Sequence, residues 1–235
     1  MAAWHVAPTP RPPSRAGRGR ARVRPHRQAG RPVTPPAPAG AWQPPPSVAA
    51  WRHVRAREGF EVTFFRPHGS GWRLQGSTAA VEAGRAWTVE YTIEVDAGWR
   101  TLHARATSRS VAGLFHLELE GDAHGSWRVD GRPAPTLQGC VDVDLEASAM
   151  TNALPLRRLD LRPGEPATVP AVYVRAEGLA VERLEQTFER LPGDEPRFSY
   201  AVPAFATACQ LRFDGAGLVL DYPGLAVRVR SAGGR

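Results

Sequence analysis

Apolar and polar residues alternate over most of this chain, and this period of two constrains the fold more than any other feature. In residues 86–95 every second residue is a large apolar one, and the residues between them are threonine or glutamate. Residues 112–120 alternate in the same way. Alternation of this kind is typical of a β-strand that buries one face and exposes the other.

About a dozen such segments follow one another, separated by turn sequences rich in glycine, proline and aspartate, such as Asp130-Gly131 and Asp214-Gly215. No helical pattern long enough to connect parallel strands lies between them. We therefore predict an all-β, mainly antiparallel fold: one sheet, rolled or closed on itself. The predicted strands lie near 60–66, 72–82, 86–95, 99–109, 112–120, 126–130, 168–175, 179–190, 197–202, 206–213, 217–221 and 225–230.

The stretch Gly139–Leu161 changes character halfway. Its first part alternates valine and leucine with Asp142 and Asp144, which predicts a strand with one apolar and one acidic face. The second part, residues 151–159, predicts one short helix. Asn152, like Ser148 and Thr151, is a good N-cap candidate, and a proline at 155 is tolerated only in a first helical turn. Leu154 and Leu159 are expected to point inward.

Charge is distributed unevenly. Residues 1–57 hold eleven arginines and no acidic residue, whereas the remainder holds nineteen arginines against twenty-three acidic residues. The first fifty residues also combine proline, glycine and alanine with almost no large aliphatic side chains, so burial cannot offset the entropy of ordering them. We predict a disordered tail over residues 1–57 and a folded domain over residues 58–235.

The tail has two interpretations. It is either a basic arm that makes weak contact with nucleic acid or an anionic membrane, or a mis-assigned start with no specific role. Two cysteines do not form a disulfide framework in a chain of this length, and neither a secretory signal nor a run of about 18 apolar residues is present. These observations predict a cytoplasmic protein without a transmembrane segment.

Catalytic and metal sites receive little support from the sequence. Cys140 with His103 or His116 could form a thiol nucleophile, but a small buried cysteine is far commoner in such a strand. The seven histidines show no metal-binding spacing, so we predict no metal and no cofactor. Asp142 and Asp144 could serve as paired carboxylates in acid–base catalysis, or could be structural partners of arginines.

Six sequence blocks follow one another along the chain: Gly71–Gly76, Tyr91–Asp96 with Trp99–Thr101, Trp127–Gly131, Gly139–Leu145, Thr151–Leu159 and Gly217–Gly224. Blocks of this kind in this order resemble the putative glycolipid-binding family of bacterial proteins. Phe188 departs from the family's pattern, which has tyrosine there, and so lacks a hydroxyl.

The resemblance, which covers about residues 60–230, implies a spiral β-roll wrapped around one helix, a homodimer, and a cavity for a glycolipid-like molecule. Arginines on such a helix need partners, and Asp142, Asp144 and Asp96 are the nearest acidic candidates. Core packing is expected for each of Trp72, Trp87, Trp99 and Trp127, and Trp99, next to Arg100, is the first candidate for an exception. The predicted ligand-binding residues are Trp99, Arg100, Asp142, Asp144, Asn152, Arg157 and Arg158.

The function predicted from the sequence is therefore non-catalytic binding of an amphiphilic, glycolipid-like ligand in an apolar cavity with a few polar groups. The alternative is an enzyme that acts on a lipid or sugar substrate through Asp142 and Asp144.

Overall fold

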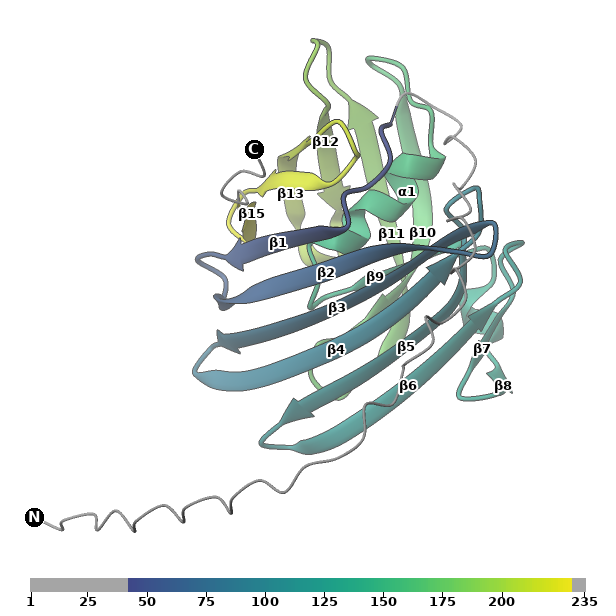
Figure 1. The fold of residues 1–235 in the computed structure, drawn as a ribbon, viewed down its shortest axis with the longest axis vertical. Helices are drawn as coiled ribbons and strands as arrows, with labels where there is room; N and C mark the ends of the chain where they lie inside the picture. Colours follow the sequence, from purple (N-terminus) through teal and green to yellow (C-terminus); the bar gives the residue numbers. More distant parts are fainter. Residues whose placement is uncertain (1–41, 230–235) are drawn as a thin grey trace, which may run out of the picture. The chain divides into compact units, whose positions relative to one another are not determined.

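Strands make up most of residues 42–229, the part of the chain that the computed structural model describes (Figure 1). They form one fifteen-stranded sheet. The strands are β1 (Val48–His53), β2 (Glu58–His68), β3 (Gly71–Glu82), β4 (Arg85–Val95), β5 (Thr101–Ser110), β6 (Gly113–Gly121), β7 (Trp127–Val129), β8 (Arg132–Pro133), β9 (Asp142–Leu145), β10 (Pro166–Val174), β11 (Val181–Arg190), β12 (Arg197–Val202), β13 (Thr207–Phe213), β14 (Val219–Tyr222) and β15 (Ala226–Arg228).

Strand order follows the chain almost everywhere. The order across the sheet is β8-β7-β6-β5-β4-β3-β2-β1-β15-β14-β13-β12-β11-β10-β9, so β1 and β15 join the first half of the chain to the second. Every pairing is antiparallel except that of β9 with β10. Hairpins therefore generate nearly the whole sheet, as turn sequences between alternating segments predict.

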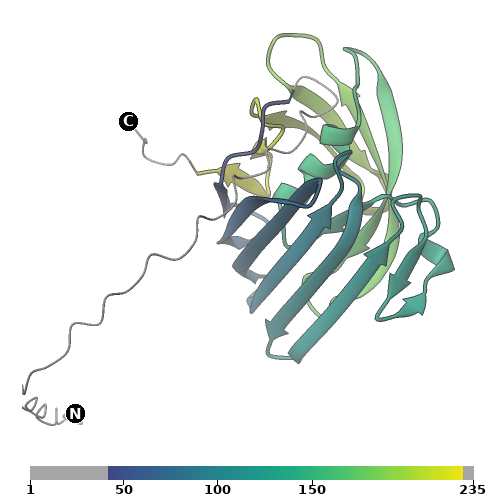
Figure 2. The same cartoon turned by 45° about the vertical axis from the view of Figure 1, so that its right-hand side comes forward.

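The sheet curls, and β2–β6 form one curved wall of it (Figure 2). The Thr101 amide at the start of β5 donates to the Val141 carbonyl beside β9, at 3.0 Å. All four residues of β9 are buried. The acidic face predicted for this strand is therefore enclosed, because the curled sheet covers both sides of it. The predicted antiparallel sheet, rolled around one short helix, is confirmed.

The helix α1 (Ala153–Arg158) lies within the curve and follows a 3₁₀ turn at Met150–Asn152. Leu154 packs into the core cluster of the first half of the sheet, and Leu156 into that of the second half. The expectation that Leu159 points inward is wrong. The helix ends at Arg158, and Leu159 adopts an extended conformation that leaves it partly exposed.

The sheet also begins earlier than the sequence predicted. β1 lies within the segment 1–57 assigned to the tail, yet it pairs with both β2 and β15. Trp51 is fully buried, and its indole N–H donates to the Val219 carbonyl at 2.7 Å. A six-residue strand between prolines and arginines gives too weak an alternation to detect. Residues 1–41, which carry most of the predicted tail, lie outside the described residues.

Glu61 attaches the inner segment to the sheet. This fully buried carboxylate on β2 accepts hydrogen bonds from the Tyr91 hydroxyl (2.7 Å), the Ala149 amide (2.8 Å) and the Ser148 hydroxyl. Burial raises its pKa. Gly76 makes the arrangement possible, because a Cβ there would come within 2.1 Å of the Tyr91 ring.

Replacing Glu61 with leucine should lower the free energy of unfolding by about 2–4 kcal/mol, because three buried donors lose their acceptor. Urea unfolding measures the change. Glu58→Leu, at an exposed position of the same strand, is the matched control and should change stability by less than about 0.5 kcal/mol. Equal stability of the two variants would contradict the role assigned to Glu61.

Candidate ligand-binding site

A cleft of about 160 Å³ opens between β9, the start of the helical segment and the second half of the sheet. Its walls mix aliphatic residues with three tyrosines and a few charged or amide groups. Small-molecule sites are commonly built in this way, with a few placed polar groups among apolar walls. The lining residues are Arg57, Asp144, Leu145, Glu146, Ser148, Asn152, Tyr173, Leu184, Tyr200, Val202, Phe205, Thr207, Tyr222 and Leu225.

Asp144 is the carboxylate at the inner wall of the cleft. β9 places it there, between the helical segment and β11. The Thr151 hydroxyl donates to it at 2.8 Å and the Gln186 amide at 2.6 Å. Burial is the main cause that raises the pKa of Asp144 to about 6, and these two hydrogen bonds oppose that shift. Near neutral pH the group is thus close to its titration range.

Two other lining residues have polar atoms without partners. Asn152 is 6% exposed, and its Oδ1 accepts no hydrogen bond from the described residues. Arg57 is 4% exposed, and its Nε and Nη1 donate none within the same part of the chain. The Glu82 carboxylate lies 4.0 Å from the Arg57 Nε, beyond hydrogen-bond distance. The Arg57 guanidinium also lies over the Trp87 ring, 5.4 Å from its centroid. Buried polar groups normally have hydrogen-bond partners, so both residues have unmet hydrogen-bonding capacity in the lining of the cleft.

Three tyrosines supply flat apolar surface with a hydroxyl at one edge. The rings of Tyr200 and Tyr222 meet edge to face with centroids 5.8 Å apart, and Phe205 packs against Tyr173 at 5.2 Å. Burial raises the pKa of all three phenols, so they stay neutral hydroxyls. Aromatic faces of this type pack against sugar rings or acyl chains.

The predicted site residues fall into separate groups. Asp144 and Asn152 line the cleft. Asp142, which is 1% exposed, forms an ion pair with Arg158 at 2.5 Å. This pair fixes the end of α1 against β9, as the sequence argument for an acidic partner predicted. Asp142 and Arg158 are outside the cleft lining.

Arg157 has backbone and aromatic partners rather than a carboxylate. Its guanidinium lies 3.9 Å from the centroid of Trp99 and donates to the carbonyls of Ala216 and Gln43, the latter at 3.2 Å. Trp99 is 2% exposed and also stacks on Trp72, so it belongs to the core. Arg100 lies at the surface, 3.8 Å from Asp96. A ligand role for Trp99, Arg100 and Arg157 stays a prediction.

Sequence reasoning missed the tyrosines and Arg57. Arg57 was assigned to the tail because it ends a run of arginines without acids. The tyrosines lie on alternating strands far apart in the chain, and no motif connects them. The register of β10, β12 and β14 is what brings Tyr173, Tyr200 and Tyr222 to one cleft.

The residues considered for a thiol nucleophile do not form a catalytic arrangement. Cys140 is fully buried, and burial is the main cause that raises the pKa of its thiol to about 11. His103 pairs with Glu118, and His116 lies on an exposed position of β6. Within residues 42–229 no three potential metal ligands cluster, and no helix is long and apolar enough to cross a membrane.

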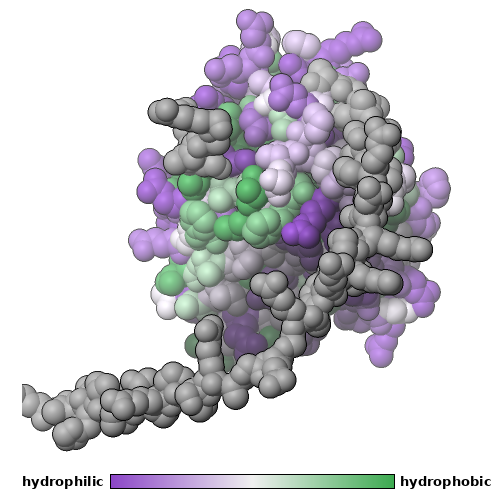
Figure 3. All heavy atoms as spheres, viewed as in Figure 1, coloured by the Kyte–Doolittle hydropathy of each residue, from purple (hydrophilic) through white to green (hydrophobic). Residues whose placement is uncertain are grey.

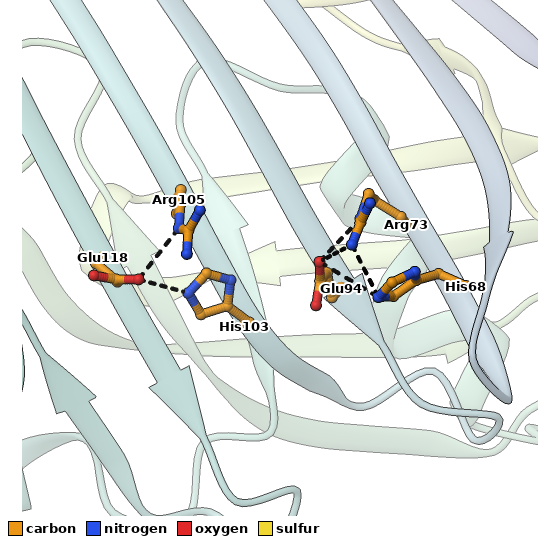
Figure 4. Close-up of polar contacts among 6 residues, drawn as sticks. All are labelled: His68, Arg73, Glu94, His103, Arg105 and Glu118. Carbon is orange, nitrogen blue, oxygen red and sulfur yellow. Dashed lines mark hydrogen bonds and ion pairs between the residues drawn. The ribbon is translucent and has the colours of Figure 1, made fainter.

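A polar cluster lies on the outer side of β2–β6 (Figure 4). Arg73 pairs with Glu94 at 2.8 Å, and Glu118 pairs with His103 at 3.0 Å and with Arg105 at 3.2 Å. These pairs leave the side chains little unmet hydrogen-bonding capacity. Exposed ion pairs of this kind are common and contribute little energy. The cluster is therefore a weaker ligand site than the cleft. Its members are His68, Arg73, Glu94, His103, Arg105 and Glu118.

The raised pKa of Asp144 predicts a pH-dependent contribution to stability. A carboxyl group whose pKa is higher in the folded state stabilises the fold below about pH 4, and this contribution is lost as pH rises through about 6. The stability difference between the wild type and Asp144→Asn should therefore fall by roughly 2 kcal/mol between pH 4 and pH 7. Urea unfolding at each pH measures it. Parallel pH profiles for the two proteins would contradict the assignment.

Comparison with known proteins gives three results. The model of a family described as putative glycolipid-binding matches residues 48–228. A crystal structure of a DUF1089 family protein from Pseudomonas aeruginosa is similar, with 30% identity, a TM-score of 0.62, and coverage of 81% of this chain and 97% of that one. No curated protein matches.

A beta-barrel-like domain of unknown function, DUF1849, from Brucella abortus shows only 10% identity and a TM-score of 0.40, with 77% of this chain and 92% of that chain covered. The family match spans every strand from β1 to β15. The chain therefore belongs to the putative glycolipid-binding family.

Proposed function

We propose that this protein binds an amphiphilic, glycolipid-like molecule without transforming it, and that the sugar headgroup occupies the cleft. The observation that carries the proposal is a cleft whose lining combines the carboxylate of Asp144 with Arg57 and Asn152, two residues with buried atoms that have no hydrogen-bond partner in the described residues. Its volume of about 160 Å³ is close to that of an apolar cavity of about 150 Å³ that holds one benzene ring. One six-membered ring is thus the size that fits.

The chemistry of the walls favours a sugar over a simple ion. Arg57 only donates hydrogen bonds, the ionised Asp144 only accepts them, and Asn152 can do both. Sugar hydroxyls also both donate and accept, so one ring can satisfy groups of opposite character. A small anion would meet the carboxylates of Asp144 and Glu146 in the same space. The tyrosine faces suit the apolar C–H side of the ring.

Binding is favoured over catalysis because the two predicted carboxylates are used differently. Asp142 is paired with Arg158, and of these two aspartates only Asp144 lines the cleft, where Glu146 is the other carboxylate. A pair of carboxylates in acid–base catalysis would both have to reach the substrate. Turnover through Asp142 and Asp144, a homodimer, a cytoplasmic location and a nucleic-acid contact of the N-terminal segment stay predictions.

The proposal is tested with a soluble short-chain glycoside, octyl glucoside below its micelle concentration, by titration calorimetry. Asn152→Ala should weaken binding about tenfold, because the variant can no longer make the hydrogen bond between the Asn152 side chain and a sugar hydroxyl. Arg132→Ala, at an exposed position of β8 outside the cleft, is the control and should bind as the wild type does. Arg100→Ala tests a site residue that the sequence predicted and that lies outside the cleft, and binding in the cleft leaves its affinity unchanged.

Two results would count against it. The first is that the wild type gives no binding heat with octyl glucoside and that organic extracts of the purified protein contain no glycolipid. The protein would then have no glycolipid-like ligand. Loss of binding in Arg100→Ala but not in Asn152→Ala would move the site away from the cleft.

A further inference from the structure

The outer side of the strands around β1 carries an unusual amount of exposed apolar surface. Six of the ten large hydrophobic side chains that are strongly exposed in the described residues lie there, between 36% and 48% exposed. Figure 3 shows apolar side chains gathered over this part of the sheet. We name this set the outer apolar face; it consists of Val48, Phe60, Phe64, Val81, Val227 and Val229.

Strand register shows that these residues are neighbours. Val48 lies opposite Phe64 across β1 and β2. Arg52 lies opposite Phe60 on one side and Val227 on the other. β15, β1, β2 and β3 are consecutive in the sheet, so the side chains form one continuous surface. Isolated exposed hydrophobic residues need no explanation, but a continuous patch marks an interaction surface.

The charges around the patch fit an anionic partner. Arg52 lies within it and Arg66 at its border on β2, and both are exposed. Two carboxylates lie on the same side in the described residues: Glu58 at the start of β2, and Asp221, which is opposite Val227 across β14 and β15. The 41 residues that precede the described part of the chain hold eight arginines and no acidic residue. Exposed phenylalanines with arginines at their border are the chemistry of surfaces that bind anionic lipid bilayers.

The patch also lies close to the cleft. The β1–β2 turn is hydrogen-bonded to the β14–β15 turn, with the Val54 amide donating to the Leu225 carbonyl at 2.9 Å. Arg57 and Leu225, in these two turns, line the cleft. Phe60 and Val227 follow only two or three residues later, which is about 7–10 Å along a strand.

From this arrangement we propose that the outer apolar face docks on an anionic lipid bilayer and brings the cleft to the headgroups. The cleft, if it holds a sugar as proposed above, would then take the headgroup of a glycolipid whose acyl chains remain in the bilayer. This explains why a cleft with room for one ring serves a lipid ligand. The docking itself rests on the patch and its charges; only the headgroup step rests on the proposed function.

The test is cosedimentation of the full chain with vesicles of phosphatidylcholine, with and without phosphatidylglycerol. The wild type should bind the anionic vesicles more strongly, and added salt should weaken the binding. Phe60→Ser combined with Phe64→Ser should reduce binding at least about tenfold, because two apolar rings no longer enter the interface. Val111→Ser combined with Leu114→Ser removes exposed apolar residues elsewhere and is the matched control.

Octyl glucoside binding by the same variants separates the two ideas. The Phe60/Phe64 variant should keep wild-type glycoside affinity and melting temperature while losing vesicle binding. Vesicle binding equal to that of the wild type would overturn the docking face, and no vesicle binding by the wild type would overturn docking altogether. Glycoside binding that fails while vesicle binding persists would refute the cleft alone.

The alternative occupant of the face is a second copy of the chain. Light scattering of the same proteins identifies it. A wild-type dimer that the Phe60/Phe64 substitutions convert to a monomer, without vesicle binding by either protein, would assign the face to self-association and overturn the bilayer proposal.

Discussion

The need to bury the inner face of one long sheet governs this structure. Nearly every strand presents a buried row to the inside, and a flat sheet of fifteen strands would leave that row in water. Curling solves the problem only if something fills the curve. The segment from Cys140 to Arg158 does so: it is almost entirely buried and contacts both halves of the sheet.

Polar contacts decide how that segment is positioned. Apolar packing would tolerate several placements of a short helix, whereas the Glu61 carboxylate accepts hydrogen bonds only from groups brought to one place. The pair formed by Asp142 and Arg158 and the hydrogen bonds of Arg157 constrain the other end. Buried polar groups are costly when they lack partners, so these contacts disfavour alternative packings.

The same arrangement leaves the cleft. On the side of Trp99 the interior is filled, because the Arg157 guanidinium lies over the Trp99 ring, 3.9 Å from its centroid. On the side of Asp144 and Asn152 the walls are tyrosines from separate strands, and side chains do not fill the space between them. A binding site in this fold is thus the part of the interior that the central segment does not occupy, with an apolar outer face nearby.

The sequence by itself determined most of the strands after residue 57, because an alternation of period two can be read from local order alone. It also predicted the strand–helix segment at 139–161 and an acidic partner for an arginine of that helix, and the structure shows this partner to be Asp142, paired with Arg158. Asp144 and Asn152, two of the predicted ligand-binding residues, line the cleft, and their ligand role stays a prediction. Only the tertiary structure decided that β1 belongs to the sheet, that Trp99 is buried, and that Arg57 joins three tyrosines around one cleft. Those facts depend on how strands far apart in the chain pair and curl. The pattern of side chains within any one strand does not specify that pairing.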